Sequence, residues 1–226
     1  MNTGALSELG EKLVTRGFAF ISRFMPGTSS AAAFSSLAFV DLVEGLNSVQ
    51  ALKPRRSDEA PPNTYSGNFG TGEFPLHTDL AHWAVPPRFV ALRCVHGTSR
   101  VSTRLLDGRA LIASVGVGAL RRALVQPRRP LRNGKQLLRL LERDENSNEY
   151  MLRWDYLYLR PATRFSERII AEALQHLSGV KATEVILLDI GDTLILDNWR
   201  MLHGRSSTPE HSQRRHVDRS YLKGIR

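Results

Sequence analysis

The fold is best recognised in one segment, Gly191-Asp-Thr-Leu-Ile-Leu-Asp-Asn-Trp-Arg-Met-Leu-His-Gly-Arg205. It contains two turn signals, Gly191-Asp192 and Asp197-Asn198, because Gly, Asp and Asn accommodate the dihedral angles of tight turns. The apolar run 193–196 between them is typical of a buried strand. The segment therefore predicts a turn, a strand and a second turn, followed by His203 beside a glycine.

Short strands are predicted on both sides of this segment. They cover residues 18–21, 49–52, 73–79, 89–95, 101–106, 150–159, 184–188 and 215–222. Helical spacing of apolar residues is found at 6–14, 31–40, 111–124 and 166–177. Residues 57–74 are rich in Pro, Gly, Ser and Asn and predict a loop or lid. This pattern predicts a mainly β (α+β) chain with flanking helices, built as an antiparallel barrel or jelly roll. We expect residues 1–226 to form a single domain.

Composition excludes several classes of protein. With 42% hydrophobic and 23% charged residues among 226, the chain has the composition of a soluble globular domain and not of a disordered, coiled-coil or fibrous one. The single cysteine, Cys94, cannot form an internal disulfide. No apolar run approaches the roughly 18 residues of a membrane span, and no secretory signal is visible. We expect no membrane partner and a cytoplasmic location.

The net charge of +9 permits an anionic partner but does not choose one. Basic residues are concentrated in the stretch 121–143, whose simplest interpretation is a solvated face.

The segment His77-Thr-Asp79 is the first chemical signal. On a strand, the side chains of residues 77 and 79 point the same way, so an imidazole and a carboxylate would share one face as neighbouring metal ligands. Alone the pattern is weak, since the chain contains a second example in His216-Val-Asp218.

Together, His77-Thr-Asp79, the segment 191–205 and Arg215-His-Val-Asp-Arg219 resemble the clavaminate synthase-like (TauD/TfdA) iron(II)/2-oxoglutarate-dependent oxygenases. The resemblance runs from about Gly17 to the end of the chain and implies a double-stranded β-helix, the cupin-like jelly-roll barrel. It also implies that His77, Asp79 and His203 form the catalytic two-histidine, one-carboxylate set that binds Fe(II), which leaves three positions of the ion for 2-oxoglutarate and O2.

The resemblance further implies an arginine for the distal carboxylate of 2-oxoglutarate, because a planar guanidinium can bind a carboxylate through two bonds. Arg214 and Arg215 are both candidates. Arg215 is preferred, because the spacing to Arg219 matches the family and strand alternation would turn both side chains inward and Arg214 outward. Thr103 resembles the threonine that binds the same carboxylate, although Arg100-Val-Ser precedes it where the family usually has glycines.

The implied reaction is hydroxylation of an unactivated C–H in a small polar molecule, amino-acid-like or anionic, with release of succinate and CO2. Retention of Asp79 favours hydroxylation over halogenation, and desaturation or cyclisation is possible at the same centre. Candidate substrate-binding residues are Arg219, Arg153, Asn68 and Trp199. His82 is expected to point away from His77 and Asp79.

Two other functions compete with this one. An inactive barrel could use the basic stretch on nucleic acid, but the complete set of matched site residues argues against a nucleic-acid partner. A zinc hydrolase on the same three ligands would leave Arg215, Thr103 and the final strand without a role.

Overall fold

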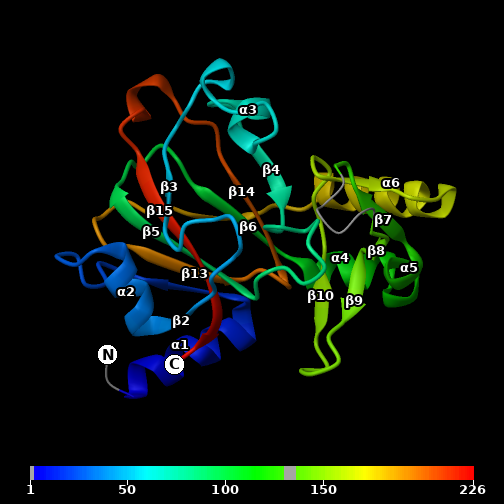
Figure 1. Cartoon of the computed structure of the whole chain (residues 1–226), viewed down its shortest axis with the longest axis horizontal. Helices are drawn as coiled ribbons and strands as arrows, with labels where there is room; N and C mark the ends of the chain where they lie inside the picture. The colour runs from blue at the N-terminus through cyan, green and yellow to red at the C-terminus, as the bar shows by residue number, and fades with distance from the viewer. Residues whose placement is uncertain (1–2, 130–135) are drawn as a thin grey trace.

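Two antiparallel sheets face each other in the computed structural model, which describes residues 3–129 and 136–226 (Figure 1). Within these residues the larger sheet has six strands in the order β1-β13-β5-β15-β2, with β3 also paired to β15. Its strands are β1 (Phe18–Ile21), β2 (Ala38–Val40), β3 (Gln50–Leu52), β5 (Phe89–His96), β13 (Thr193–Asp197) and β15 (His216–Ile225). The smaller sheet has the order β12-β6-β14-β4. Its strands are β4 (Phe74–His77), β6 (Thr103–Asp107), β12 (Thr183–Val185) and β14 (Met201–Arg205).

An apolar core fills the space between the two sheets. It includes Leu194 and Leu196 of β13 from the larger sheet and Leu105 of β6 from the smaller one. Ile195 packs on the opposite face of β13, because successive side chains of a strand point to opposite sides. Both faces of β13 are therefore covered, which explains why the run 193–196 is apolar at nearly every position.

Two helices cover the outer face of the larger sheet. They are α1 (Thr3–Arg16) and α2 (Ser30–Leu37), which pack with Ala19, Ala91 and Ile195 of the sheet. Ser29 begins α2 by accepting a hydrogen bond from the main-chain N–H of Ala32. Figure 1 shows both helices on one side of the molecule.

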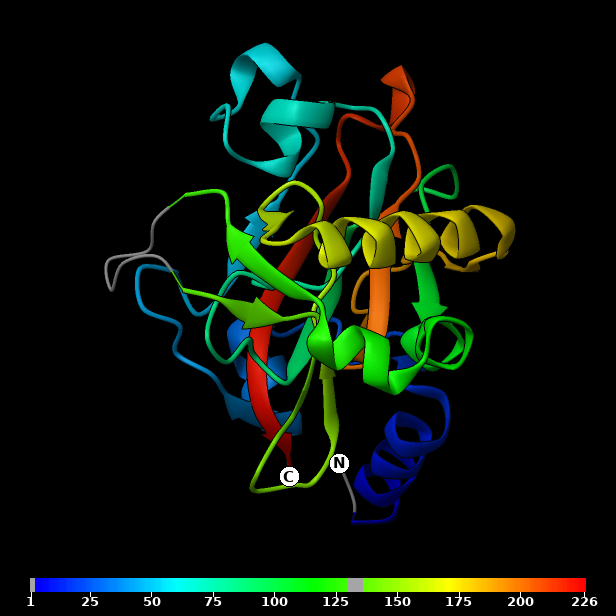
Figure 2. The ribbon, with the colours of Figure 1, turned by 90° about the vertical axis from the view of Figure 1, so that its right-hand side faces the viewer.

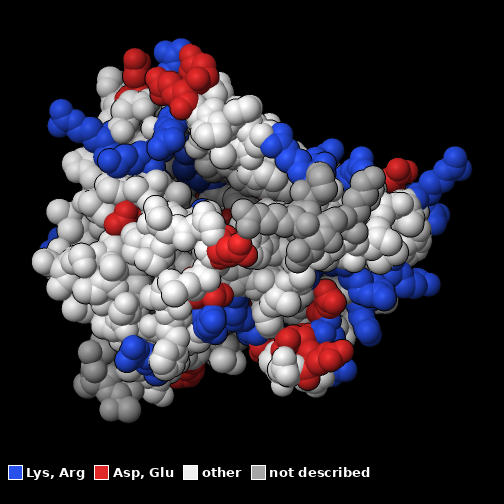
Figure 3. Space-filling view, in the orientation of Figure 1, with Lys and Arg blue, Asp and Glu red and all other residues white. Residues whose placement is uncertain are grey.

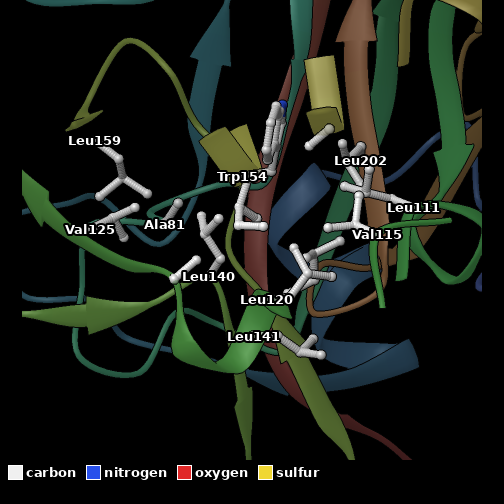
Figure 4. Close-up of a cluster of buried hydrophobic side chains, with 14 of the residues drawn as sticks. Ala81, Leu111, Val115, Leu120, Val125, Leu140, Leu141, Trp154, Leu159 and Leu202 are labelled. Atoms are coloured by element: carbon white, nitrogen blue, oxygen red, sulfur yellow. The ribbon is translucent and has the colours of Figure 1, made fainter. Parts of the chain in front are cut away.

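An inserted layer covers the outer face of the smaller sheet. It contains α4 (Gly108–Val115), α5 (Val117–Arg122), β7 (Leu124–Pro127), β8 (Leu138–Arg139), β9 (Leu141–Arg143), β10 (Tyr150–Leu152), β11 (Leu159–Pro161) and α6 (Arg164–Gly179). Figure 2 shows α6 lying across this side. A second apolar cluster joins the insertion to Leu202 of β14, with Trp154, Leu111 and Leu120 among its members (Figure 4).

Two short 3-10 helices and one α-helix lie in the remaining loops of the described chain. These are η1 (Ser57–Glu59), α3 (Tyr65–Phe69) and η2 (Glu210–Ser212). The segment with η1 and α3 is the one that the sequence predicts as a loop or lid, and it projects from one end of the sheets (Figure 1).

The expected fold class is confirmed at the level of antiparallel sheets with flanking helices. Three expected elements are divided or change type. The expected strand 150–159 is divided into β10 and β11, because Asp155 accepts hydrogen bonds from the main-chain N–H groups of Leu157 and Tyr158 and forms a turn. The expected helix 111–124 is divided at Gly116, which has a φ of 90°. The last residues of the expected helix 31–40 instead form β2.

Charged side chains are unevenly distributed over the surface. Figure 3 shows lysines and arginines gathered at the end of the molecule that carries α5 and α6. Arg121, Arg122, Arg128 and Arg129 of the basic stretch are exposed, whereas Arg132 and Lys135 lie outside the described residues. In the described chain, no helix is both long enough and apolar enough to cross a membrane.

Candidate metal centre and cofactor cavity

Three metal-ligating side chains meet at the edge of the smaller sheet. His77 ends β4 and is the register partner of His203 on the neighbouring strand β14. Asp79 follows two residues after β4. One ligand atom from each of the three lies within 4.8 Å of the others. All three residues are buried. Tertiary structure thus brings together residues that are 126 positions apart in the chain, 203 − 77.

The imidazole of His77 is held in one orientation. Its Nδ1 lies 2.9 Å from the carbonyl oxygen of Pro75, and its ring stacks on Tyr65 at a centroid distance of 4.1 Å. A carbonyl on Nδ1 fixes the tautomer and leaves Nε2 as the free ligand atom. This Nε2 lies 3.4 Å from Oδ1 of Asp79, and Nε2 of His203 lies 3.5 Å from the same oxygen.

Asp79 is fixed through both its main chain and its side chain. Its main-chain N–H donates to Oδ1 of Asn198, and its carbonyl accepts from Nδ2 of Asn198. On the side chain, Oδ2 accepts from Arg219 at 2.9 Å and from the Tyr221 hydroxyl at 3.2 Å. Oδ1 is therefore the oxygen that faces the two imidazoles.

The electrostatics favour a cation at this point. Burial opposes ionisation of Asp79, but Arg219 and the two imidazoles outweigh it and hold the pKa of this carboxyl well below its usual range. Burial, followed by the charge of His77, lowers the pKa of His203 and so favours the neutral imidazole that binds metals. Two imidazole nitrogens and one carboxylate oxygen are the donor set typical of non-haem Fe(II).

A cavity of about 500 Å³ opens directly onto these three side chains. Arg215, Thr103 and Arg219 line it as well. Arg215 is only 8% exposed, and within the described residues its main-chain N–H donates to the carbonyl of Ser212 while its guanidinium makes no hydrogen bond. Burial lowers the pKa of Arg215, because a guanidinium removed from water loses solvation of its charged form. A buried, unpaired guanidinium in a cavity is a site for an anion.

The other candidate for this role, Arg214, is exposed and does not line the cavity. Thr103, at the start of β6, is 4% exposed and faces the cavity. The expected alternation along the last strand therefore holds in the structure, with residues 215 and 219 inward and 214 outward, although β15 itself begins at His216.

Three of the four expected substrate-binding residues do not line this cavity. Arg153 is fully buried and does not line the cavity; it donates to the carbonyls of Ala81, Trp83 and Ala84 and pairs with Glu142. It thereby holds the segment that follows Asp79.

Trp199 and Asn68 also differ from expectation. The indole of Trp199 donates to the carbonyl of Pro86 and is covered by the guanidinium of Arg88. The amide of Asn68 donates to the carbonyls of Pro62 and Thr64 within the α3 segment. Neither side chain lines the cavity, because each satisfies nearby main-chain carbonyls instead.

His82 lines the cavity, so its expected place on the opposite face is wrong, although as expected it does not join the ligand cluster that His77, Asp79 and His203 form among the described residues. That expectation assumed a strand continuing through residue 80. In the structure β4 ends at His77, and Leu80 has a φ of 53°, which turns the chain and brings His82 back to the cavity.

Several cavity residues carry no motif in the sequence. Tyr65, Asp155 and Tyr158 lie on the side of His77, and Lys53 and Arg55 come from the chain after β3. They belong to loops whose paths depend on contacts with distant segments. The local spacing of residues in the sequence therefore does not predict that these side chains line the cavity. The sequence pointed to this region in one respect: Asp155 lies two residues after Arg153, a candidate substrate-binding residue.

Arg205 is a further residue that sequence reasoning missed. It lies two positions after His203 on β14, where strand alternation places it on the same face. Its guanidinium lies over the ring of Phe74 and donates to the carbonyls of Gly70 and Gly72. Burial and the charge of Arg215 lower its pKa to about 10. Arg205 thus joins the strand that carries His203 to the segment after α3.

Comparison with solved structures finds iron oxygenases of the same fold. An asparagine oxygenase in complex with Fe(II), 2S,3S-3-hydroxyasparagine and succinate superposes with a TM-score of 0.72 at 18% identity, covering 98% of this chain and 80% of its own. OrfP, a non-heme iron oxygenase in complex with Fe and alpha-ketoglutaric acid, gives 0.68 at 19% identity, with coverages of 98% and 80%. PvcB from Pseudomonas aeruginosa, an Fe, alpha-ketoglutarate dependent oxygenase, gives 0.67 at 17% identity, with 96% and 79%. No protein-family model and no curated protein sequence matches the chain. The chain thus has the fold of iron and 2-oxoglutarate-dependent oxygenases.

Proposed function

We propose that this chain is an Fe(II)- and 2-oxoglutarate-dependent dioxygenase that hydroxylates an unactivated C–H of a small, amino-acid-like substrate. One observation carries the proposal: the buried set of His77, Asp79 and His203 opens onto the same cavity as the unpaired guanidinium of Arg215. A metal site alone would serve many reactions. A metal site together with a buried cation for a dicarboxylate is specific to this chemistry.

The metal would be held by Nε2 of His77, Nε2 of His203 and Oδ1 of Asp79. When bound, Fe(II) supplies the activation of O2 that couples decarboxylation of 2-oxoglutarate to hydroxylation, with succinate and CO2 as co-products. The chain's own task is to fix the ligands, orient the substrate and exclude water. The apolar side chains of Leu80, Phe74 and Val217 in the cavity lining serve the last purpose.

Arg215 would bind the distal carboxylate of 2-oxoglutarate through two N–H groups, with the Thr103 hydroxyl as a further donor. Both side chains are buried, line the cavity and make no hydrogen bond within the described residues. An anion placed between them would satisfy both. Arg214, in contrast, is exposed and does not line the cavity, which supports Arg215 for this role.

The rest of the cavity suits a substrate that carries both a positively and a negatively charged group. Asp155, on the His77 side, lines the cavity and offers a carboxyl whose Oδ1 already accepts hydrogen bonds from the main chain of Leu157 and Tyr158. Lys53 and Arg55 offer cations. The solved neighbours contain 2S,3S-3-hydroxyasparagine in one case and (3S)-hydroxy-L-Arg in another. These observations support an amino-acid-like substrate over a purely anionic one.

We also propose that the two sheets are the halves of a double-stranded β-helix and that residues 1–226 act as one domain. The core between β13 and β6 supports this arrangement, because it joins the two sheets into one unit. An inactive barrel that binds nucleic acid is not favoured, since such a protein would have no use for a buried metal set and an unpaired buried arginine.

The test uses purified protein under anaerobic conditions with Fe(II) and 2-oxoglutarate. We expect the weak visible metal-to-ligand charge-transfer band of chelated 2-oxoglutarate in the wild-type protein and in Arg214→Ala, and its absence in His203→Ala. Absence of the band in wild-type protein that has been shown to contain iron would overturn the proposal. If the band is present in the wild-type protein, a screen of free amino acids for coupled succinate release would identify the substrate.

A further inference from the structure

The two oxygens of the Asp79 carboxylate have different surroundings. Oδ1 faces Nε2 of His77 and Nε2 of His203, at 3.4 and 3.5 Å. Oδ2 accepts two hydrogen bonds, one from Arg219 at 2.9 Å and one from the Tyr221 hydroxyl at 3.2 Å. One oxygen is thus directed to the metal position, and the other is occupied by protein donors.

Both donors to Oδ2 come from β15 and are themselves held in place. Residues 219 and 221 share one face of the strand by alternation. Tyr221 is 2% exposed. Arg219 donates from Nε and from its second terminal nitrogen to Oε1 of Gln50, its register partner on β3, at 3.1 and 2.6 Å. The guanidinium is therefore fixed between Gln50 and Asp79.

This arrangement affects how many coordination positions of a bound metal ion the Asp79 carboxylate would occupy. A carboxylate can bind through one oxygen or through both. Two histidines and one single-oxygen carboxylate leave three positions open on an octahedral ion, which 2-oxoglutarate and O2 together require. If Oδ2 also bound the metal, one of these positions would be lost.

We propose that Arg219 and Tyr221 are positioning residues that hold Oδ2 of Asp79 away from the metal, so that Asp79 binds through Oδ1 alone. This inference rests on the proposed function. It gives Arg219 a role different from the substrate contact expected from the sequence, since the donors of its guanidinium are directed to Asp79 and Gln50. The anionic group of the substrate is then left to other cations of the cavity.

The test counts the water molecules on a bound metal ion and needs neither 2-oxoglutarate nor a substrate. Mn(II) is added to the wild-type protein and to Arg219→Gln and Tyr221→Phe, and water-proton relaxation reports the waters on the bound ion. Arg214→Gln is the matched control, because it removes an exposed arginine one residue before Arg215. Metal affinity is measured in the same titrations.

We expect one water fewer on Mn(II) in Arg219→Gln than in the wild type and the control. Tyr221→Phe preserves the shape and charge of the site, and we expect it to weaken Mn(II) binding by about 10-fold, the effect typical of losing an outer hydrogen-bond partner of a metal ligand. Thermal unfolding checks that each variant is folded. If Arg219→Gln does not fold, the water count on Mn(II) in Tyr221→Phe decides, and a count equal to that of the wild type would overturn the inference.

Two results would count against the inference, and they differ. If the variants match the wild type in water count and in affinity, the positioning role is wrong and the proposed function stands. If the wild-type protein binds no Mn(II), Co(II) or Fe(II), the proposed metal site fails and the positioning role fails with it.

Discussion

The side-chain amide of Asn198 is hydrogen-bonded to both main-chain polar groups of Asp79. Its Oδ1 accepts from the Asp79 N–H at 2.7 Å, and its Nδ2 donates to the Asp79 carbonyl at 3.0 Å. Nδ2 also donates to the carbonyl of Pro87. Asn198 belongs to the turn that connects β13 of the larger sheet to β14 of the smaller one, so one residue joins the turn that leads to His203 to the segment that carries Asp79.

Asn198→Ala should therefore weaken both folding and metal binding. Asn198 is 1% exposed, and its removal leaves three buried main-chain groups without partners, each of which costs about 1–3 kcal/mol. We expect a lower Tm in the metal-free protein and a weaker affinity for Fe(II), measured by calorimetry and by metal titration. An unchanged affinity in a folded variant would show that Asp79 is positioned without Asn198.

Asp79→Ala should abolish iron-dependent turnover of 2-oxoglutarate, because it removes the only negative charge of the proposed ligand set. The measurement is succinate release together with bound iron per chain. Asp218→Ala is a matched control, since Asp218 occupies the same place in the second His-x-Asp pattern but hydrogen-bonds to His216, outside the ligand cluster of the described residues. Equal losses in the two variants would contradict the assignment.

Arg215→Ala should raise the 2-oxoglutarate concentration needed for half-maximal turnover far more than Arg214→Ala does. Loss of a buried partner of a carboxylate costs about 2 kcal/mol or more, which corresponds to about 30-fold. Arg214 is exposed, so its replacement should change the requirement little. Initial rates of succinate formation at varied 2-oxoglutarate give both values, and equal values would show that the alternation along the last strand is not what selects the arginine.

Gly204→Ala should disturb the pairing of β14 with β4 beside His203. A Cβ at Gly204 would lie 2.5 Å from the carbonyl oxygen of Phe74, and this main-chain atom cannot move without shifting β4. We expect a loss of about 1–3 kcal/mol in unfolding free energy and weaker metal binding. Gly118 in α5 has nothing within 4 Å of its Cβ position, so Gly118→Ala is the control and should be neutral or stabilising.

Cys94 should resist alkylation in the folded protein. Burial, followed by the charge of Asp192, raises the pKa of its thiol to about 11. Only the thiolate reacts, so labelling with iodoacetamide at pH 8 should be slow until the chain is unfolded in denaturant. The folded state keeps the thiol proton more tightly than the unfolded state does. Stability from this group is therefore complete below the ordinary thiol pKa and is lost as the pH rises through about 11. Fast labelling of folded protein would contradict this.

Much of the β framework could be predicted because strand alternation and turn chemistry are local properties. The apolar run 193–196 forms β13 between the expected turns. The phase of the last strand was predictable for the same reason, with residue 215 buried and residue 214 exposed. The ends of elements were less predictable, since β4 stops at His77 where the sequence suggested a strand to Asp79.

The cavity beyond the metal ligands could not be predicted residue by residue. His82 reaches it only because the chain turns at Leu80, and Tyr65 stacks on His77 from a five-residue helix in a segment that the sequence shows only as a loop. Such positions depend on contacts between distant segments, and a local sequence pattern contains no information on those contacts.

By itself, the sequence determined which side chains could serve as metal ligands and which residues of each strand share a face, because the two-residue repeat of a strand is set by covalent geometry. The tertiary structure alone decided that His77 and His203 are neighbours, that Oδ2 of Asp79 accepts from Arg219 and Tyr221, and that the buried guanidinium of Arg215 lines the cavity with no hydrogen-bond partner among residues 3–129 and 136–226. These relationships arise where sheets and loops pack against one another, because packing brings residues into contact even when they are far apart in the sequence.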